Sequence, residues 1–285
     1  MSLGRALRYW THVSLDLLAL CILYIGFLFV RGLIAHTVDV REALERGRAL
    51  ADLETQLHLS VERPFQKLAM RIPLAISAMN LFYIWGHVPL MLGEFAWLRV
   101  RSLQWFTVLR NGLLLSAIPS VILFIIVPTA PPRLVPGLGL VDTVAGPNHS
   151  NYGLQPGVFA NHYAAIPSMH VGWALAVGLA LCLAMGSTRW RWLVLVVPVA
   201  MALSVMGTGN HYVLDWVVGC AIAVASLAAA WRWEEWWQGR KRPVELEVAA
   251  GRLEAAPSAV ERWPARQLLL DRTVGSLTRL ARRRE

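Results

Sequence analysis

Long apolar stretches recur along the chain and alternate with short polar or basic segments. A helix that crosses a membrane needs about 20 mostly apolar residues. Six stretches meet or approach this length, at about 13–30, 72–92, 112–127, 167–184, 193–206 and 211–230. The pattern therefore predicts an all-α, polytopic membrane protein with a bundle of six transmembrane helices.

The segments between the apolar stretches differ in character. Residues 31–71 are of mixed charge, and within them Leu50, Leu53 and Leu57 recur at helical spacing, which predicts an amphipathic surface helix over 49–59. Residues 97–110 form a polar connection. Residues 129–165 form a loop rich in Gly, Pro and Asn, and a loop of this length inside a compact protein usually has a function.

Two regions follow from this pattern. We expect residues 1–232 to form the transmembrane domain that holds the candidate site, with its core at about 50–232. Residues 233–285 form a basic tail that opens with a tryptophan cluster suited to the membrane interface. Within the tail, 266–284 has the spacing of a second amphipathic helix, and a partly disordered basic segment is the alternative.

Composition and charge narrow the class of partner. Hydrophobic residues make up 56% of the chain and charged residues 16%, which argues against a soluble domain. The net charge of +9 comes from arginines in short loops and in the tail, so we expect contact with membrane lipids and not with nucleic acid. The same distribution predicts a plasma membrane protein with both termini cytoplasmic and the 129–165 loop and 207–210 turn facing outwards.

The fourth apolar stretch starts with Pro167-Ser168-Met169-His170 at its outward end. Proline suits the first turn of a helix, and the free N–H groups of that turn can bind an anion. Ser168 adds a hydroxyl donor, and His170 can protonate a leaving oxygen. A capped helix start with an incidental histidine is the alternative.

The last apolar stretch starts with His211 and carries Asp215 four residues later, on the same face of a helix. The carboxylate can keep one imidazole nitrogen protonated and leave the other free as a nucleophile or base. A carboxylate in an apolar span costs about 2.5–3.5 kcal/mol on insertion scales, so it needs a partner. A buried structural ion pair is the alternative.

Arg133 is the sole basic residue of the 129–165 loop. Its planar guanidinium matches the oxygens of a phosphate, while contact with a lipid headgroup is the alternative. The three outward ends can converge on one site at the membrane surface.

Together these motifs resemble the type 2 phosphatidic acid phosphatase superfamily, over residues 50–232. The resemblance rests on the motifs Pro-Ser-Met-His at 167–170 and His-x-x-x-Asp at 211–215. Pro128-Thr129-Ala130-Pro131-Pro132-Arg133, with Asn161-His162-Tyr163-Ala164-Ala165, is more similar to the branch that contains inositol phosphorylceramide synthase.

The resemblance implies phosphoryl transfer on a lipid phosphate or phosphodiester, without a metal or another cofactor. His211 would attack phosphorus and become phosphohistidine, and Asp215 would orient it. His170 would protonate the leaving alcohol and then activate water or an acceptor hydroxyl. Ser168 and Arg133 would bind phosphoryl oxygens, and Thr129 and Asn161 of the branch motifs are expected to bind substrate.

The sequence departs from the superfamily pattern at two positions that are cationic there, Ile126 and Val205. Neutral donors such as Thr208 and Asn210, or another arginine that folds into the site, would have to replace them. His87 and His162 are lesser candidates for lining the site. The alternatives to an enzyme are a membrane metal or cofactor protein, with His162, His170, His211 and Asp215 as ligands, and a non-catalytic relative.

Overall fold

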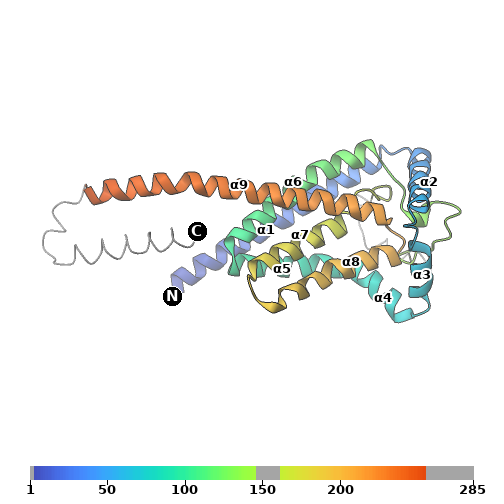
Figure 1. Ribbon diagram of the computed structural model, residues 1–285, viewed down its shortest axis with the longest axis horizontal. Helices are drawn as coiled ribbons and strands as arrows, with labels where there is room; N and C mark the ends of the chain where they lie inside the picture. Colours follow the sequence, from blue (N-terminus) through green and yellow to red (C-terminus); the bar gives the residue numbers. More distant parts are fainter. Residues whose placement is uncertain (1–2, 146–160, 255–285) are drawn as a thin grey trace. The chain divides into compact units, whose positions relative to one another are not determined.

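The computed structural model describes residues 3–145 and 161–254, which are mainly helical (Figure 1). The chain forms two compact units, Met1–Arg232 and Trp233–Glu285. The predicted tail helix at 266–284 lies outside the described residues. In order, the helices are α1 (Leu3–Ala35), α2 (Val40–Gln56), α3 (Glu62–Met70), α4 (Pro73–Leu81), a π-helical turn (Phe82–Gly86), α5 (His87–Arg101), α6 (Leu103–Ile126), a 3-10 turn (Pro132–Leu134), α7 (Met169–Ala184), a 3-10 turn (Arg189–Leu195), α8 (Val196–Gly207) and α9 (Val213–Glu254).

The helices confirm an all-α, polytopic membrane protein. Five helical stretches are long and apolar enough to cross a membrane: Val13–Ala35, Pro73–Arg101, Leu103–Ile126, Arg189–Gly207 and Val213–Arg240. The shorter α7 is apolar along its whole length and is the most enclosed helix, since it packs against α5, α6 and α8. Six spans, with α7 as the sixth, stay a prediction.

Side-chain exposure fits a lipid environment around the bundle. Leu18, Ile22 and Ile118 are each more than half exposed in the absence of lipid. Such a surface would favour aggregation of a soluble protein, whereas lipid tails cover it in a membrane.

The polar connection expected at 97–110 is wrong. Helix α5 continues to Arg101, and α6 begins at Leu103, well before the expected start at 112. Ser102 alone separates them and caps α6 by accepting a hydrogen bond from the Trp105 N–H at 3.4 Å. Helical structure is tolerated here because Arg99 pairs with Asp16 of α1 at 2.6 Å and lies over the Phe106 ring.

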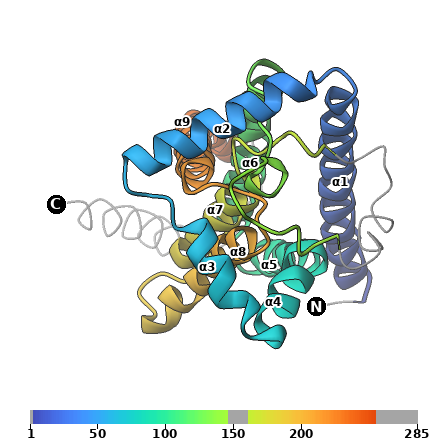
Figure 2. The same ribbon diagram turned by 90° about the vertical axis from the view of Figure 1, so that its right-hand side faces the viewer.

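The surface segment also differs from its prediction, since two helices replace the single one expected at 49–59. Asp39 caps α2, accepting from the N–H of Arg41 and Glu42, and α3 follows after a short turn. Figure 2 shows α2 and α3 lying across the end of the transmembrane bundle. Gly47 of α2 sits so close to the loop after α6 that an added Cβ would lie 2.6 Å from the Ala130 carbonyl oxygen.

The ends of α6, α7 and α9 meet beneath these surface helices. Thr129, after α6, pairs with Ala164, before α7, in an isolated parallel bridge. The Ser168 N–H at the start of α7 donates to the Asp215 carbonyl oxygen of α9 at 3.0 Å. Helices α7 and α9 also cross closely, because a Cβ on Gly172 would lie 2.4 Å from the Gly219 carbonyl oxygen. Residues far apart in the sequence therefore share one end of the bundle.

Candidate active site

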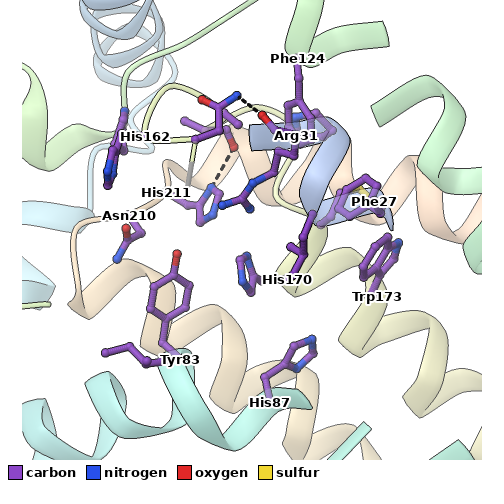
Figure 3. Close-up of a pocket in the computed structure, with 18 of the residues that line it drawn as sticks. Phe27, Arg31, Tyr83, His87, Phe124, His162, His170, Trp173, Asn210 and His211 are labelled. Atoms are coloured by element: carbon purple, nitrogen blue, oxygen red, sulfur yellow. Dashed lines mark hydrogen bonds between the residues drawn. The ribbon is translucent and has the colours of Figure 1, made fainter. Parts of the chain in front are cut away.

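A cavity of about 120 Å³ opens at this end of the bundle. It is enclosed by side chains from α1, the π-helical turn, α5, α6 and α7, by the segment after α6, and by the loops before α7 and α9 (Figure 3). Five of the expected catalytic and substrate-binding residues line it: Arg133, Asn161, His170, Asn210 and His211. The motifs around Arg133, His170 and His211 therefore do converge on one space.

His211 lies in a turn before α9, not in its first turn, since the helix begins at Val213. Its Nδ1 is 2.8 Å from the Ala165 carbonyl oxygen and 3.2 Å from Asp215 Oδ2. A carbonyl oxygen can only accept, so Nδ1 carries the hydrogen and Nε2 keeps a lone pair. The geometry thus prepares His211 as a nucleophile or base.

Asp215 supports His211 without lining the cavity. It is fully buried, and Oδ2 also accepts a hydrogen bond from the Tyr212 N–H at 2.9 Å. The pairing with His211 therefore does not come from a shared helical face, as the sequence suggested. It comes from the turn that folds His211 back over the first turn of α9.

His170 faces His211 across the cavity from the first turn of α7. The two ring centroids are 6.0 Å apart, and the His170 ring also lies 4.8 Å from Tyr83 and 5.9 Å from His87. Figure 3 shows His170 and His211 on the same cavity, with the Arg31 side chain reaching in beside His211. At this separation both imidazoles can contact a single group bound at the cavity.

The start of α7 differs from the expectation in two details. Pro167 precedes the N-cap Ser168, so it lies outside the helix. Ser168 is fully buried and does not line the cavity, and its Oγ has no hydrogen-bond partner within the described residues. The N–H groups of Met169 and His170, in the first turn of α7, have no acceptors within the helix. They, and not the Ser168 hydroxyl, are the groups at this helix start that can donate to a bound anion.

Arg133 reaches the cavity as a paired cation. It lies in the 3-10 turn after α6, and its Nε donates to Asp142 Oδ2 at 3.0 Å. Its backbone N–H donates to the Gly209 carbonyl oxygen at 3.1 Å, which ties this turn to the 207–210 turn. Asp142 therefore offsets part of its charge.

The remaining sequence candidates brace the loops around the cavity. Asn161 donates from Nδ2 to the Arg31 carbonyl oxygen at 3.1 Å, and Asn210 donates to Thr208 Oγ1 at 2.7 Å. Thr208 and Thr129 are buried, are not at the cavity, and donate to the carbonyl oxygens of Ser204 and Val127.

Sequence reasoning missed Arg31 and Tyr83 and ranked His87 and His162 low, although all four line the cavity. Arg31 belongs to the last turns of α1. The only signal for it was an arginine at the end of the first apolar stretch. Partial burial, with the positive charges of Arg133 and Arg31, lowers the pKa of His162 below its ordinary value.

Apolar side chains form one wall of the cavity. Phe27 of α1 packs on Trp173 of α7 with ring centroids 4.9 Å apart, and Phe124 of α6 lies 6.4 Å from Phe27. The site thus joins a polar, histidine-rich face to an aromatic one.

Among the described residues, no group of three or more His, Cys, Asp or Glu side chains is arranged to hold an ion. His170 and His211 face each other, but Asp215 directs its carboxylate to His211 and the backbone.

The family model described as the PAP2 superfamily matches residues 48–229, which is more than half of the chain. No curated protein and no solved structure matches the chain. The matched range contains Arg133, His170, His211 and Asp215, whereas Arg31 precedes it.

Proposed function

Since the chain belongs to the PAP2 superfamily, whose members are typically phosphatases, we propose that it is a phosphatase or phosphotransferase that forms a phosphohistidine on His211. The substrate is a lipid-linked phosphate or phosphodiester, and no metal takes part. The observation that carries this proposal is the His211 ring. Ala165 and Asp215 hold its Nδ1, and its ring centroid lies 6.0 Å from that of His170.

In the first step, His211 Nε2 attacks phosphorus and the bond from phosphorus to the leaving oxygen breaks. Protonated His170 gives its proton to that oxygen, so an alcohol departs and His170 becomes neutral. Asp215 stabilises the positive charge that develops on the His211 ring.

In the second step, neutral His170 removes a proton from water or from an acceptor hydroxyl. The oxygen attacks phosphorus, the P–N bond breaks, and Nε2 regains its lone pair. Water gives a phosphatase, and an alcohol gives a phosphotransferase.

A lipid substrate is supported by the surroundings of the cavity. Helices α1, α5 and α6, which contribute to its wall, belong to stretches that are long and apolar enough to cross a membrane. Phe27, Phe124 and Trp173 line it beside the histidines. A phosphate on an apolar anchor can therefore reach the imidazoles while its chains stay in lipid.

Two substitutions test the function. His211→Ala and His170→Ala in purified protein should each abolish phosphate release and headgroup transfer from lipid phosphates and phosphodiesters, with acceptor alcohols present. His36→Ala is the matched control, because His36 is an exposed histidine in the turn after α1. Full activity of either cavity variant would refute the mechanism.

The second candidate function is that of a membrane metal protein, and treatment with the chelator EDTA distinguishes it from the phosphohistidine enzyme. Activity that survives EDTA and is inhibited by vanadate supports phosphohistidine chemistry. Loss of activity in EDTA with recovery on addition of a divalent ion supports the metal site.

A further inference from the structure

The cavity is positively charged in a way that the histidine pair does not explain. Among the described residues its lining includes two arginines, Arg31 and Arg133, and four histidines, but no Asp or Glu. A partly enclosed space with cations and no carboxylate on its wall selects an anionic ligand. Because Asp142 pairs with Arg133 and offsets part of its charge, we consider Arg31 first as the cation that would bind this ligand.

Arg31 carries its charge into the cavity, and among the described residues its buried nitrogen has no hydrogen-bond partner. The Nε atom is buried and makes no hydrogen bond within the described part of the chain. Figure 3 shows the guanidinium directed from α1 towards His211 and the space beside His170. A buried donor on a charged group is costly when it is unpaired, so a ligand oxygen is the partner that this position lacks.

The end of α1 is fixed where this contact requires it. Asn161 donates a hydrogen bond to the Arg31 carbonyl oxygen at 3.1 Å. One helical turn earlier, Phe27 packs on Trp173, and about one turn later Ile34 is buried in the same cluster. The guanidinium is therefore presented by an anchored helix, which lowers the entropic cost of binding.

From this placement we propose that Arg31 is a phosphate ligand that binds the non-bridging oxygens of the group that His211 attacks. The proposal rests on the proposed function and extends it, because a helix outside the matched range 48–229 completes the site. The planar guanidinium can hold two oxygens at once while Arg133 and the first N–H groups of α7 contact the same group. The ligand class is a phosphoryl group, carried by a lipid or free.

Binding measurements test this role apart from turnover. Isothermal titration of the full chain in detergent uses inorganic phosphate in one arm and a non-hydrolysable, short-chain lipid phosphonate in the other. Arg31→Gln should weaken both ligands about 10- to 100-fold. Arg31→Lys should fall between this variant and the wild type, since it keeps the charge and loses the fork. Arg71→Gln, at an exposed arginine between α3 and α4, should bind like the wild type.

The outcomes separate the two proposals. Unchanged affinity of Arg31→Gln for inorganic phosphate overturns the assignment, and so does a loss confined to the lipid phosphonate. If Arg31→Gln does not fold, Arg31→Lys decides, because wild-type affinity in that variant also overturns the assignment. Activity of His211→Ala, by contrast, refutes the phosphohistidine mechanism and leaves the phosphate-binding result for Arg31 standing.

Discussion

At the scale of residues, the imidazole of His211 depends on its two acceptors. Ala165 and Asp215 both accept from Nδ1, but only Asp215 carries a charge that can offset an imidazolium. Asn at this position keeps the size of the side chain and removes the charge.

Asp215→Asn should therefore lower kcat by about 100-fold or more, while KM and the affinity for inorganic phosphate change little. The measurement is steady-state turnover of a lipid phosphate with phosphate binding alongside. Asp52→Asn, on an exposed position of α2, is the control. Wild-type kcat in Asp215→Asn would show that the carboxylate has only a structural role.

Residue types indicated several of the side chains that gather at the cavity, but not all of the geometry of the site. His170, His211 and Arg133 stood out because their motifs start or end apolar stretches, and the structure brings them to one cavity. Ser168 and Thr208 carried the same kind of signal, yet both are turned into the protein. The direction of a side chain in a turn depends on tertiary contacts, which spacing along the chain does not encode.

At the scale of elements, the crossing of α7 and α9 sets the distance between the two halves of the site. A Cβ added at Gly219 would lie 2.2 Å from the Ser168 carbonyl oxygen, which is backbone and cannot move aside. Small residues at such crossings let membrane helices approach closely.

Gly219→Ala should thus destabilise the protein by about 1–3 kcal/mol or more and separate His170 from His211. The apparent Tm in detergent and the turnover rate both report this change. Gly93→Ala in α5 is the matched control, because nothing lies within 4 Å of its added Cβ. Equal Tm values for the two variants would contradict the close crossing.

The surface helices hold the start of α9 through two buried carboxyl groups. Glu54 of α2 accepts from the Leu214 N–H at 2.7 Å, and Glu62 of α3 accepts from the Val213 N–H at 3.0 Å. Burial, followed by the contact with Glu62, raises the pKa of Glu54 to about 8. The sequence indicated an amphipathic surface helix here, but pairing of these glutamates with a backbone more than 150 residues away left no local signal.

The raised pKa of Glu54 makes the stability of the folded protein depend on pH, and the direction of this dependence follows from the shift. Between the ordinary value of 4.5 and about 8, the folded state binds more protons at Glu54 than the unfolded state. Stability from this group is therefore present at low pH and lost as the pH rises through that window. Glu54→Gln, which mimics the protonated form, should flatten the fall of Tm across this range.

The measurement is the apparent Tm by tryptophan fluorescence between about pH 5 and pH 9. Glu45→Gln, on the exposed face of α2, should keep the wild-type slope. If the fall of Tm with pH had the same slope in Glu54→Gln as in the wild type, this would contradict a protonated Glu54 carboxyl at the start of α9.

At the scale of the whole molecule, apolar patterning predicted the class and most helices, because membrane spans must be apolar over their full length. It failed at 97–110, where Asp16 neutralises Arg99 inside the bundle. It also could not place Arg31, since a single arginine at the end of a span marks a membrane boundary as readily as a binding site.

The distribution of arginines predicts that the site faces outwards. In a variant without native cysteines, Ser60→Cys, between α2 and α3 at the site end, should react with an impermeant maleimide in intact cells. Ser187→Cys, after the far end of α7, should react only after lysis. The reverse pattern would place the site in the cytoplasm.

The most direct test of the central claim is the capture of the enzyme intermediate. Purified protein is mixed with a lipid labelled in its phosphate, quenched in alkali within one turnover, and digested for peptide mapping. We predict an acid-labile, alkali-stable label on the peptide that contains His211, absent from His211→Ala. Turnover with no labelled protein, or a label on any other residue, would contradict the mechanism.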